Sequence, residues 1–201
     1  MYIVNFQNSA GSICQIEPLL TYLRSGCTIR QMKTSERRLA GASLAVLVPD
    51  RTRGLSIATI QRDDRPDIPF PGRWELPGGG IEKRDYLRPG KLGAAVRCAR
   101  REAFEEIHVL VPEEAVIWQA FYPSVVDPTV YNAFVVAEGN ADSVATMDLG
   151  SEGRQCQLMS IEEFLHHDNA IVPHQMRVAD FLRGSSEQAF AYASLAQHIA
   201  A

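Results

Sequence analysis

The stretch Arg101-Glu102-Ala103-Phe104-Glu105-Glu106-Ile107 decides how this chain is interpreted. At 100° per residue, a helix through it places Glu102, Glu105 and Glu106 within an arc of about 100°. That arc adjoins the apolar stripe of the helix instead of lying opposite to it. The stripe consists of Val96, Ala99, Ala103, Ile107 and Leu110.

Two interpretations of these glutamates are open from the helix alone. A glutamate-rich helix is usually a solvated face, and this is the simpler explanation. Carboxylates at i, i+3 and i+4 repel one another by a few tenths of a kcal/mol per pair. A hard divalent cation would reverse the sign of that interaction, because such cations prefer carboxylate oxygens. The helix therefore makes a metal site a hypothesis to be weighed against its surroundings.

The segment before the helix favours the metal hypothesis. Leu76-Pro77-Gly78-Gly79-Gly80 lets the backbone approach a ligand or metal without obstruction by a Cβ atom. Alone, this glycine run would be an ordinary loop. With a strand before it and the acidic helix after it, the pattern becomes specific for a site.

Apolar patterning predicts a mixed α/β fold, with a sheet covered by helices. Predicted strands cover 42–48, 55–62, 116–122, 130–137 and 155–159. Predicted helices cover 92–107, 160–167 and 175–182, and a further helix begins at Ser185. We expect an N-terminal extension over residues 1–38, one catalytic domain over 39–184 and a C-terminal helix over 185–201.

The N-terminal extension has two open interpretations. Met32 opens a plausible shorter protein, so the residues before it could have little bearing on function. They could equally form a dimerisation arm, which would make the protein a homodimer.

Composition limits the partners and the compartment. The net charge of −4 and the absence of any Lys or Arg run longer than two argue against nucleic acid as a partner. Four cysteines without CxxC spacing indicate reduced thiols. We expect a cytoplasmic protein that does not span a membrane, because no apolar stretch reaches about 18 residues and no signal peptide is evident.

In the glycine run and the acidic helix the chain resembles the Nudix hydrolases. Residues 101–109 match the second half of that family's signature at every position except His108, where the family has glycine. LPGGGIE matches the first half, with Gly79 as the opening glycine. The resemblance covers roughly residues 40–183, and RDDRPDIPFPGRWELPGGG looks like bacterial members that cleave nucleoside triphosphates. It implies a Nudix-type α/β/α sandwich with a mixed central sheet.

The chain departs from the family signature in three ways. The loop between Gly79 and Arg101 is eight residues longer, and Gly93 stands where the family has a glutamate. We expect Glu82 or Asp85 in the longer loop to replace that carboxylate. His108 replaces the glycine that ends the helix, where a positive φ is often needed; histidine adopts that conformation more readily than most residues.

The resemblance implies a hydrolase that cleaves a nucleoside diphosphate derivative with Mg²⁺ or Mn²⁺. The implied metal ligands are Gly79, Glu102, Glu105, Glu106 and, from a loop across the site, Glu152. A plain surface-turn position for Glu152 is the competing interpretation. The implied catalytic residues are Glu102, Glu105 and Arg101. Glu102 is favoured as the base, with a further metal ligand as its alternative, and Arg101 would orient it or simply stabilise the helix.

Substrate contacts are expected from Arg62, Arg73 and Trp74, which could instead bond the Asp-rich loop or belong to the core. His166, His167 and His174 are expected at solvated helix ends. The favoured reaction converts a nucleoside triphosphate, oxidised or not, into a monophosphate and pyrophosphate. ADP-ribose, a nucleotide sugar or a capped RNA end are alternative substrates, and a regulator that binds a nucleotide without cleaving it is the alternative outside catalysis.

Overall fold

The long strand β1 (Arg38–Asp50) is the centre of the sheet in the structure, a computed structural model that describes residues 38–87 and 93–184. It runs parallel to β6 and antiparallel to β2 and β4, so the sheet is mixed. The strand order is β3-β2-β1-β6-β5, with β4 beside β1 and β7 beside β2. The other strands are β2 (Gly54–Gln61), β3 (Trp74–Glu75), β4 (Gly78–Gly80), β5 (Val116–Pro123), β6 (Val130–Glu138) and β7 (Gln155–Ser160).

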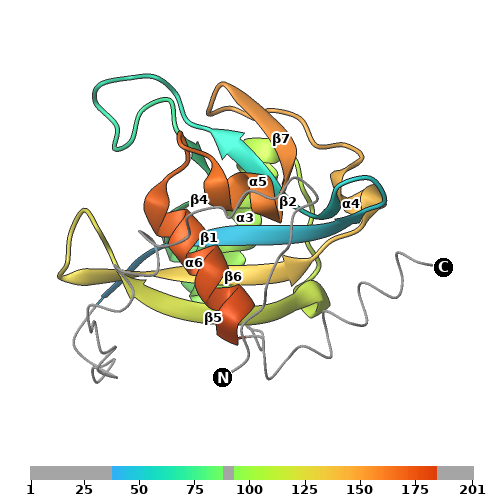
Figure 1. The fold of residues 1–201 in the computed structure, drawn as a ribbon. Coiled ribbons are helices and arrows are strands. Elements are labelled where there is room, and N and C mark those ends of the chain that lie inside the picture. The colour runs from blue at the N-terminus through green and yellow to red at the C-terminus, as the bar shows by residue number, and fades with distance from the viewer. Residues whose placement is uncertain (1–37, 88–92, 185–201) are drawn as a thin grey trace. The chain divides into compact units, whose positions relative to one another are not determined.

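Helices cover both faces of this sheet (Figure 1). Leu44 and Val46 of β1 pack with α3, whereas the alternate residues Ala45 and Leu47 pack with α5 and α6. The α/β/α sandwich with a mixed central sheet that the resemblance implied is therefore confirmed. The helices are α2 (Lys83–Leu87), α3 (Ala94–Ile107), the 3₁₀ turn η1 (Glu113–Ala115), α4 (Ala141–Val144), α5 (Ile161–His166) and α6 (Val172–Gly184).

The glycine run forms β4, which lies directly against the first half of β1. Gly78 pairs with Ser43, and Gly79 pairs with Ala42. A Cβ atom on Gly78 would lie 2.5 Å from the Ala42 carbonyl oxygen, so this approach requires glycine. This pairing fixes the glycine run beside the first half of β1, next to α3.

The five predicted strands and the three predicted helices within the described residues are confirmed, with ends that differ by a few residues. The sequence patterns did not predict β3, β4, α2, η1 or α4, which are too short for a periodic signal. Most of the expected N-terminal extension and the helix expected from Ser185 lie outside the described residues. No helix in residues 38–87 and 93–184 is long and apolar enough to cross a membrane. Cys98 and Cys156 are free thiols.

His108 ends α3 in the left-handed conformation, with φ 54° and ψ 27°. Its backbone N–H donates to the carbonyls of Ala103 and Phe104, which closes the last turn. The expected positive φ is confirmed.

Replacing His108 by glycine is expected to raise the free energy of unfolding by about 1 kcal/mol, because glycine adopts this conformation without a Cβ penalty. Urea unfolding of both proteins measures the difference. The edge-to-face contact of the His108 ring with Phe104, at 6.0 Å between centroids, is lost in the variant and limits the gain. An unchanged or lower stability would contradict a strained helix end.

Candidate active site

Helix α3 carries its three glutamates along the border between core and solvent. Glu106 is 8% exposed, and the side chains of Glu102 and Glu105 are 14% and 39% exposed. The gradient follows from the helical arc, because Glu106 is flanked by the buried residues Ala103 and Ile107. The carboxylates thus range from buried to accessible along one edge of the helix.

Strand β4 passes close over these carboxylates. The backbone N–H of Gly78 donates a hydrogen bond of 2.9 Å to Oε2 of Glu106. A Cβ atom on Gly79 would lie 2.5–2.7 Å from the carboxyl atoms of Glu102. The Glu102 carboxylate can therefore lie against β4 only because Gly79 has no Cβ atom.

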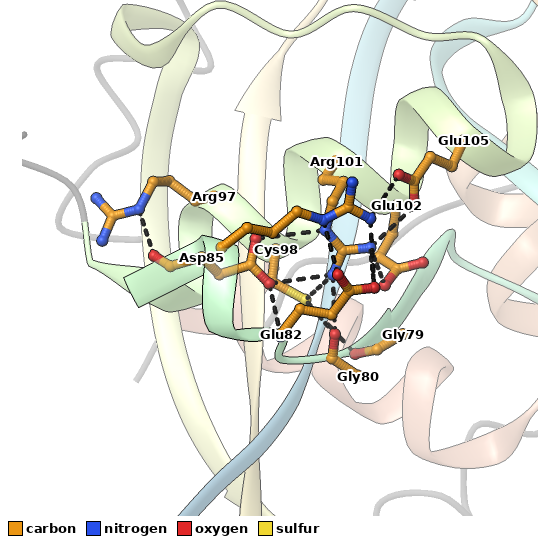
Figure 2. Close-up of polar contacts among 10 residues, drawn as sticks. Gly79, Gly80, Glu82, Asp85, Arg97, Cys98, Arg101, Glu102 and Glu105 are labelled. Atoms are coloured by element: carbon orange, nitrogen blue, oxygen red, sulfur yellow. Dashed lines mark hydrogen bonds and ion pairs between the residues drawn. The ribbon is translucent and has the colours of Figure 1, made fainter. Parts of the chain in front are cut away.

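Arg101 joins the carboxylates to the glycine run (Figure 2). Its guanidinium donates to Oε1 of Glu102 at 2.7 Å and to Oε2 of Glu105 at 2.9 Å. It also donates to the carbonyl oxygen of Gly80 at 2.9 Å. Burial opposes the charged form, but the hydrogen bonds to carboxylates outweigh it and raise the pKa of Arg101. The arginine is a permanently charged clamp that fixes two carboxylates relative to β4.

Asp85 of α2 holds the other side of Arg101. Its side chain is 4% exposed, and its Oδ2 accepts from Nη2 of Arg101 at 3.1 Å. Burial alone would raise the pKa of Asp85, but the hydrogen bonds from Arg101 and the Glu82 backbone hold it below the usual range. Glu82 lies farther away, 3.6 Å from Nη1 of Arg101. The lengthened loop thus supplies a buried carboxylate to the signature arginine, although position 93 is glycine.

The other carboxylates of the site lie in a buried region, where their negative charges repel one another. Burial raises the pKa of Glu106 to about 8, and the charges of Glu75, Glu102 and Glu152 add to the shift. Burial likewise raises the pKa of Glu75 to about 7, against the attraction of Arg62. The pKa of Glu102 is raised too, first by burial and then by Glu105 and Glu152. Four carboxylates from α3, β3 and the loop before β7 therefore share one region of negative charge.

The donor set of this cluster fits a hard divalent cation. As the side chains lie, no group of three or more His, Cys, Asp or Glu within residues 38–87 and 93–184 is arranged to hold a metal. Glu102 and Glu105 turn toward Arg101, and Glu106 turns toward Gly78. Carboxylate oxygens that raise one another's pKa are nevertheless the ligands that Mg²⁺ and Mn²⁺ prefer, and a cation among them would offset their repulsion.

The raised pKa values predict how metal-free stability changes with pH. Glu106 and Glu75 bind protons more tightly in the folded than in the unfolded protein, so their contribution is complete below about pH 4.5. It is lost as pH rises through about 7 and 8, by at most about 1.4 kcal/mol per pH unit for each carboxyl. His174 acts in the opposite sense below about pH 6.5, because its pKa is lowered to about 3.

Urea unfolding in EDTA between pH 6.5 and 8.5 isolates the two carboxyls. We expect stability to fall over this range in the wild type and to fall less steeply in Glu106→Gln. Stability that rises with pH in the wild type, or an identical slope in both proteins, would contradict the shared negative site.

A pocket of about 280 Å³ lies beside β4. It is bordered by the start of β1, by Gly78–Gly80, by Glu75 and by three polar residues of β6 and α6. These three residues are Asn132, His174 and Arg177. The glycine run therefore borders both the carboxylate cluster and the polar pocket, and Glu75 belongs to both.

The three residues predicted to contact substrate occupy different surroundings. Arg62 forms an ion pair with Glu75, and its Nε is buried without a hydrogen-bond partner. Nη1 of Arg73 donates to the Ala170 carbonyl at 3.5 Å. Trp74 is 5% exposed and packs in the core between the sheet and α5 and α6. The structure brings Arg62 to the carboxylate cluster but does not bring the Trp74 ring to the pocket.

Sequence patterns missed the polar residues of the pocket. The expected solvated position is wrong for His174, because its Nδ1 accepts the backbone N–H of Leu76 at 3.0 Å. Burial lowers its pKa to about 3, so the imidazole is neutral. Arg177 lies on the buried face of α6 between Gln175 and Val178. A cation at a core-facing position of an amphipathic helix was the available signal for this residue.

A family model, the NUDIX domain, matches residues 38–179. No curated protein matches the chain. Among solved structures, a mutT/nudix family protein from Listeria innocua aligns with 77% of this chain and 99% of its own, with a TM-score of 0.57 and 17% identity.

Two further structures are similar and contain ligands. The bifunctional NMN adenylyltransferase/ADP ribose pyrophosphatase from Francisella tularensis, complexed with AMP and Mn ion, aligns with 84% of this chain and 46% of its own (TM-score 0.57, 17% identity). The NUDIX domain of Shewanella oneidensis NrtR, complexed with ADP ribose, aligns with 82% and 96% (TM-score 0.53, 17% identity). At such identities the likeness shows the fold. The chain spans about half the length of three of the structures it matches.

Proposed function

The chain belongs to the Nudix family, and from this premise we propose that it is a metal-dependent hydrolase of the diphosphate linkage in nucleoside diphosphate derivatives. One observation carries the proposal. A buried carboxylate cluster lies so close to the glycine backbone that a Cβ atom at Gly79 would collide with Glu102. Residues 39–184 form the hydrolase domain in this proposal.

The carboxylates of Glu102, Glu105 and Glu106 and the carbonyl of Gly79 would hold Mg²⁺ or Mn²⁺. Glu152 would contribute from the loop before β7, since its charge already acts on Glu102 and Glu106. When bound, the cation would neutralise the diphosphate and make a water molecule more acidic. A substrate with several negative charges could then approach a cluster that otherwise repels it.

Glu102 is the residue proposed to accept the proton of the attacking water. Its pKa is raised by burial, which brings its basicity closer to neutral pH than that of an exposed glutamate. Arg101 fixes its orientation through the 2.7 Å hydrogen bond. Asp85 in turn fixes Arg101, so the base is positioned by a chain of buried ionic contacts.

We propose nucleoside triphosphates, oxidised or not, as the first class of substrate, with a monophosphate and pyrophosphate as products. ADP-ribose is the second class. Two similar structures contain AMP or ADP ribose. A nucleotide sugar is a further alternative, while the acidic net charge disfavours nucleic acid.

A panel of nucleoside triphosphates, ADP-ribose and nucleotide sugars, incubated with millimolar Mg²⁺ or with EDTA, tests the proposal. We expect metal-dependent turnover of at least one compound, and the products identify the bond that is cleaved. Turnover that persists in EDTA would contradict the role of the carboxylate cluster.

A nucleotide-binding regulator without turnover is the second candidate function. It is favoured by one observation, the engagement of both Glu102 and Glu105 by Arg101. Saturable binding of a panel compound, with no hydrolysis in Mg²⁺ or Mn²⁺, would support this function in place of the first.

A further inference from the structure

Arg177 of α6 is a buried cation whose guanidinium has no hydrogen-bond partner among residues 38–87 and 93–184. The residue is 5% exposed and lines the pocket beside β4. Its one recorded partner among the described residues is the ring of Tyr122, whose centroid is 5.4 Å from the guanidinium carbon. Within that part of the chain, no hydrogen-bond acceptor or carboxylate engages it. Burial lowers the pKa of Arg177, which reflects the poor compensation of its charge.

Two other polar groups of the pocket also lack partners in the described part of the chain. Ser43 is 5% exposed, and its Oγ is buried without a hydrogen-bond partner. Asn132 of β6 faces the same side of the sheet as Phe134, because its neighbour Ala133 packs with α3. No hydrogen bond of the Asn132 amide is recorded within residues 38–87 and 93–184.

His174 adds a further donor to the same pocket. Its imidazole is neutral, and its Nδ1 accepts from Leu76, so the remaining proton lies on Nε2. The carboxyl of Glu75, in contrast, is already bonded to Arg62. The pocket therefore offers several hydrogen-bond donors, with the Arg177 guanidinium among them.

Of these groups, the Oγ of Ser43 is fully buried without a partner, whereas the guanidinium nitrogens of Arg177 are not fully buried and line the pocket. A ligand in the pocket can therefore accept hydrogen bonds from Arg177 without displacing an acceptor of the described residues. Arg177 presents a planar fork that matches two adjacent acceptors, and its contact with Tyr122 leaves the edges of the fork as the donating surface. The missing partner is thus a flat group with two neighbouring acceptors.

The position of the pocket connects this group to the proposed reaction. Gly78 contacts Glu106 and also borders the pocket, and Gly79 does the same with Glu102. A substrate whose diphosphate lies at the carboxylates would extend its other end past the glycine run into the pocket. The volume of about 280 Å³ is near the lower end for ligand pockets, which suits one heterocycle and not a second nucleotide.

We propose, on the basis of the proposed function, that this pocket selects a purine with a 6-keto group, with Arg177 donating to O6 and N7. Guanine and hypoxanthine present these two acceptors side by side, and the arginine fork matches them. Adenine presents an amino donor at position 6, which would face donors in the pocket. A further phosphate is disfavoured, because the Glu75 carboxyl borders the same space.

Calorimetric binding of GMP, IMP, AMP and inorganic phosphate in EDTA tests the proposal without hydrolysis. For the wild type we expect GMP and IMP to bind at least about 10-fold more tightly than AMP. Arg177→Met should lose this preference, mainly through weaker GMP and IMP binding. Arg177→Lys should lose most of it, because an ammonium does not form the bidentate contact. Asn132→Ala, from a different element, should weaken GMP binding while leaving α6 unchanged.

Arg51→Met is the matched control, because Arg51 is exposed in the turn between β1 and β2, away from the pocket. It should bind every probe as the wild type does. Equal affinities for GMP and AMP in the wild type would overturn the proposal. Equal losses of GMP, AMP and phosphate in folded Arg177→Met would also overturn it, by assigning Arg177 to a phosphate. A purine preference without any metal-dependent turnover would remove the proposed function and leave this pocket assignment in place.

Discussion

Glu106→Gln is expected to lower kcat for the best nucleotide by about 100- to 10,000-fold, the range found for positioned charged groups in active sites. The amide has nearly the same shape as the carboxyl and can still accept the hydrogen bond from Gly78. It cannot carry the charge that a divalent cation requires. Because burial disfavours the charged carboxyl, the metal-free variant should be at least as stable as the wild type.

Steady-state kinetics in Mg²⁺ and urea unfolding in EDTA separate these two effects. Glu105→Gln should also lose much of its kcat, since Glu105 belongs to the same cluster. Glu114→Gln is the control, because Glu114 is exposed in η1, outside this cluster. Wild-type rates in both Glu105→Gln and Glu106→Gln would remove the carboxylates from the metal site.

Gly79→Ala is expected to lower kcat/KM by about 100-fold, because displacement of a catalytic group by about 1 Å can have an effect of this size. The new Cβ atom would lie 2.5–2.7 Å from the Glu102 carboxyl, which must move away. A carboxyl group is the mobile end of its side chain, so the fold should remain intact while the site is altered. Kinetics and thermal unfolding of the variant check the two parts.

The adjacent glycine provides a matched control for this change. A Cβ atom on Gly80 would be 4.0 Å from its nearest neighbour, the Ala40 carbonyl oxygen. Gly80→Ala should therefore lose much less activity than Gly79→Ala. Equal losses in Gly79→Ala and Gly80→Ala would attribute the effect to the flexibility of β4 and would contradict the steric argument for Glu102.

The acidic helix could be predicted because its information is local. The spacing of Glu102, Glu105 and Glu106 places them at the core border, and the structure has them there with decreasing burial from Glu106 to Glu105. The left-handed end at His108 also follows from its position after the helix. Asp85 was one of two expected replacements, and its position in a five-residue helix with 3% exposure distinguishes it from Glu82.

The polar pocket could not be predicted because its residues meet through the tertiary fold. Arg177 and His174 come from α6, Asn132 from β6 and Ser43 from β1, and no local pattern links them. For Trp74 the sequence left substrate stacking and the core open, and the structure has its ring in the core. Burial decides between these roles, and burial at a single position depends on packing from distant segments.

Mn²⁺ binding, measured by electron paramagnetic resonance, tests most directly whether the cluster beside Gly79 is a metal site. The account predicts saturable binding to the wild type, stronger binding as pH rises from 6 to 8.5 because the ligands must be deprotonated, and a large loss of affinity in Glu106→Gln. Failure of the wild type to bind Mn²⁺, or equal binding by wild type and Glu106→Gln, would contradict it.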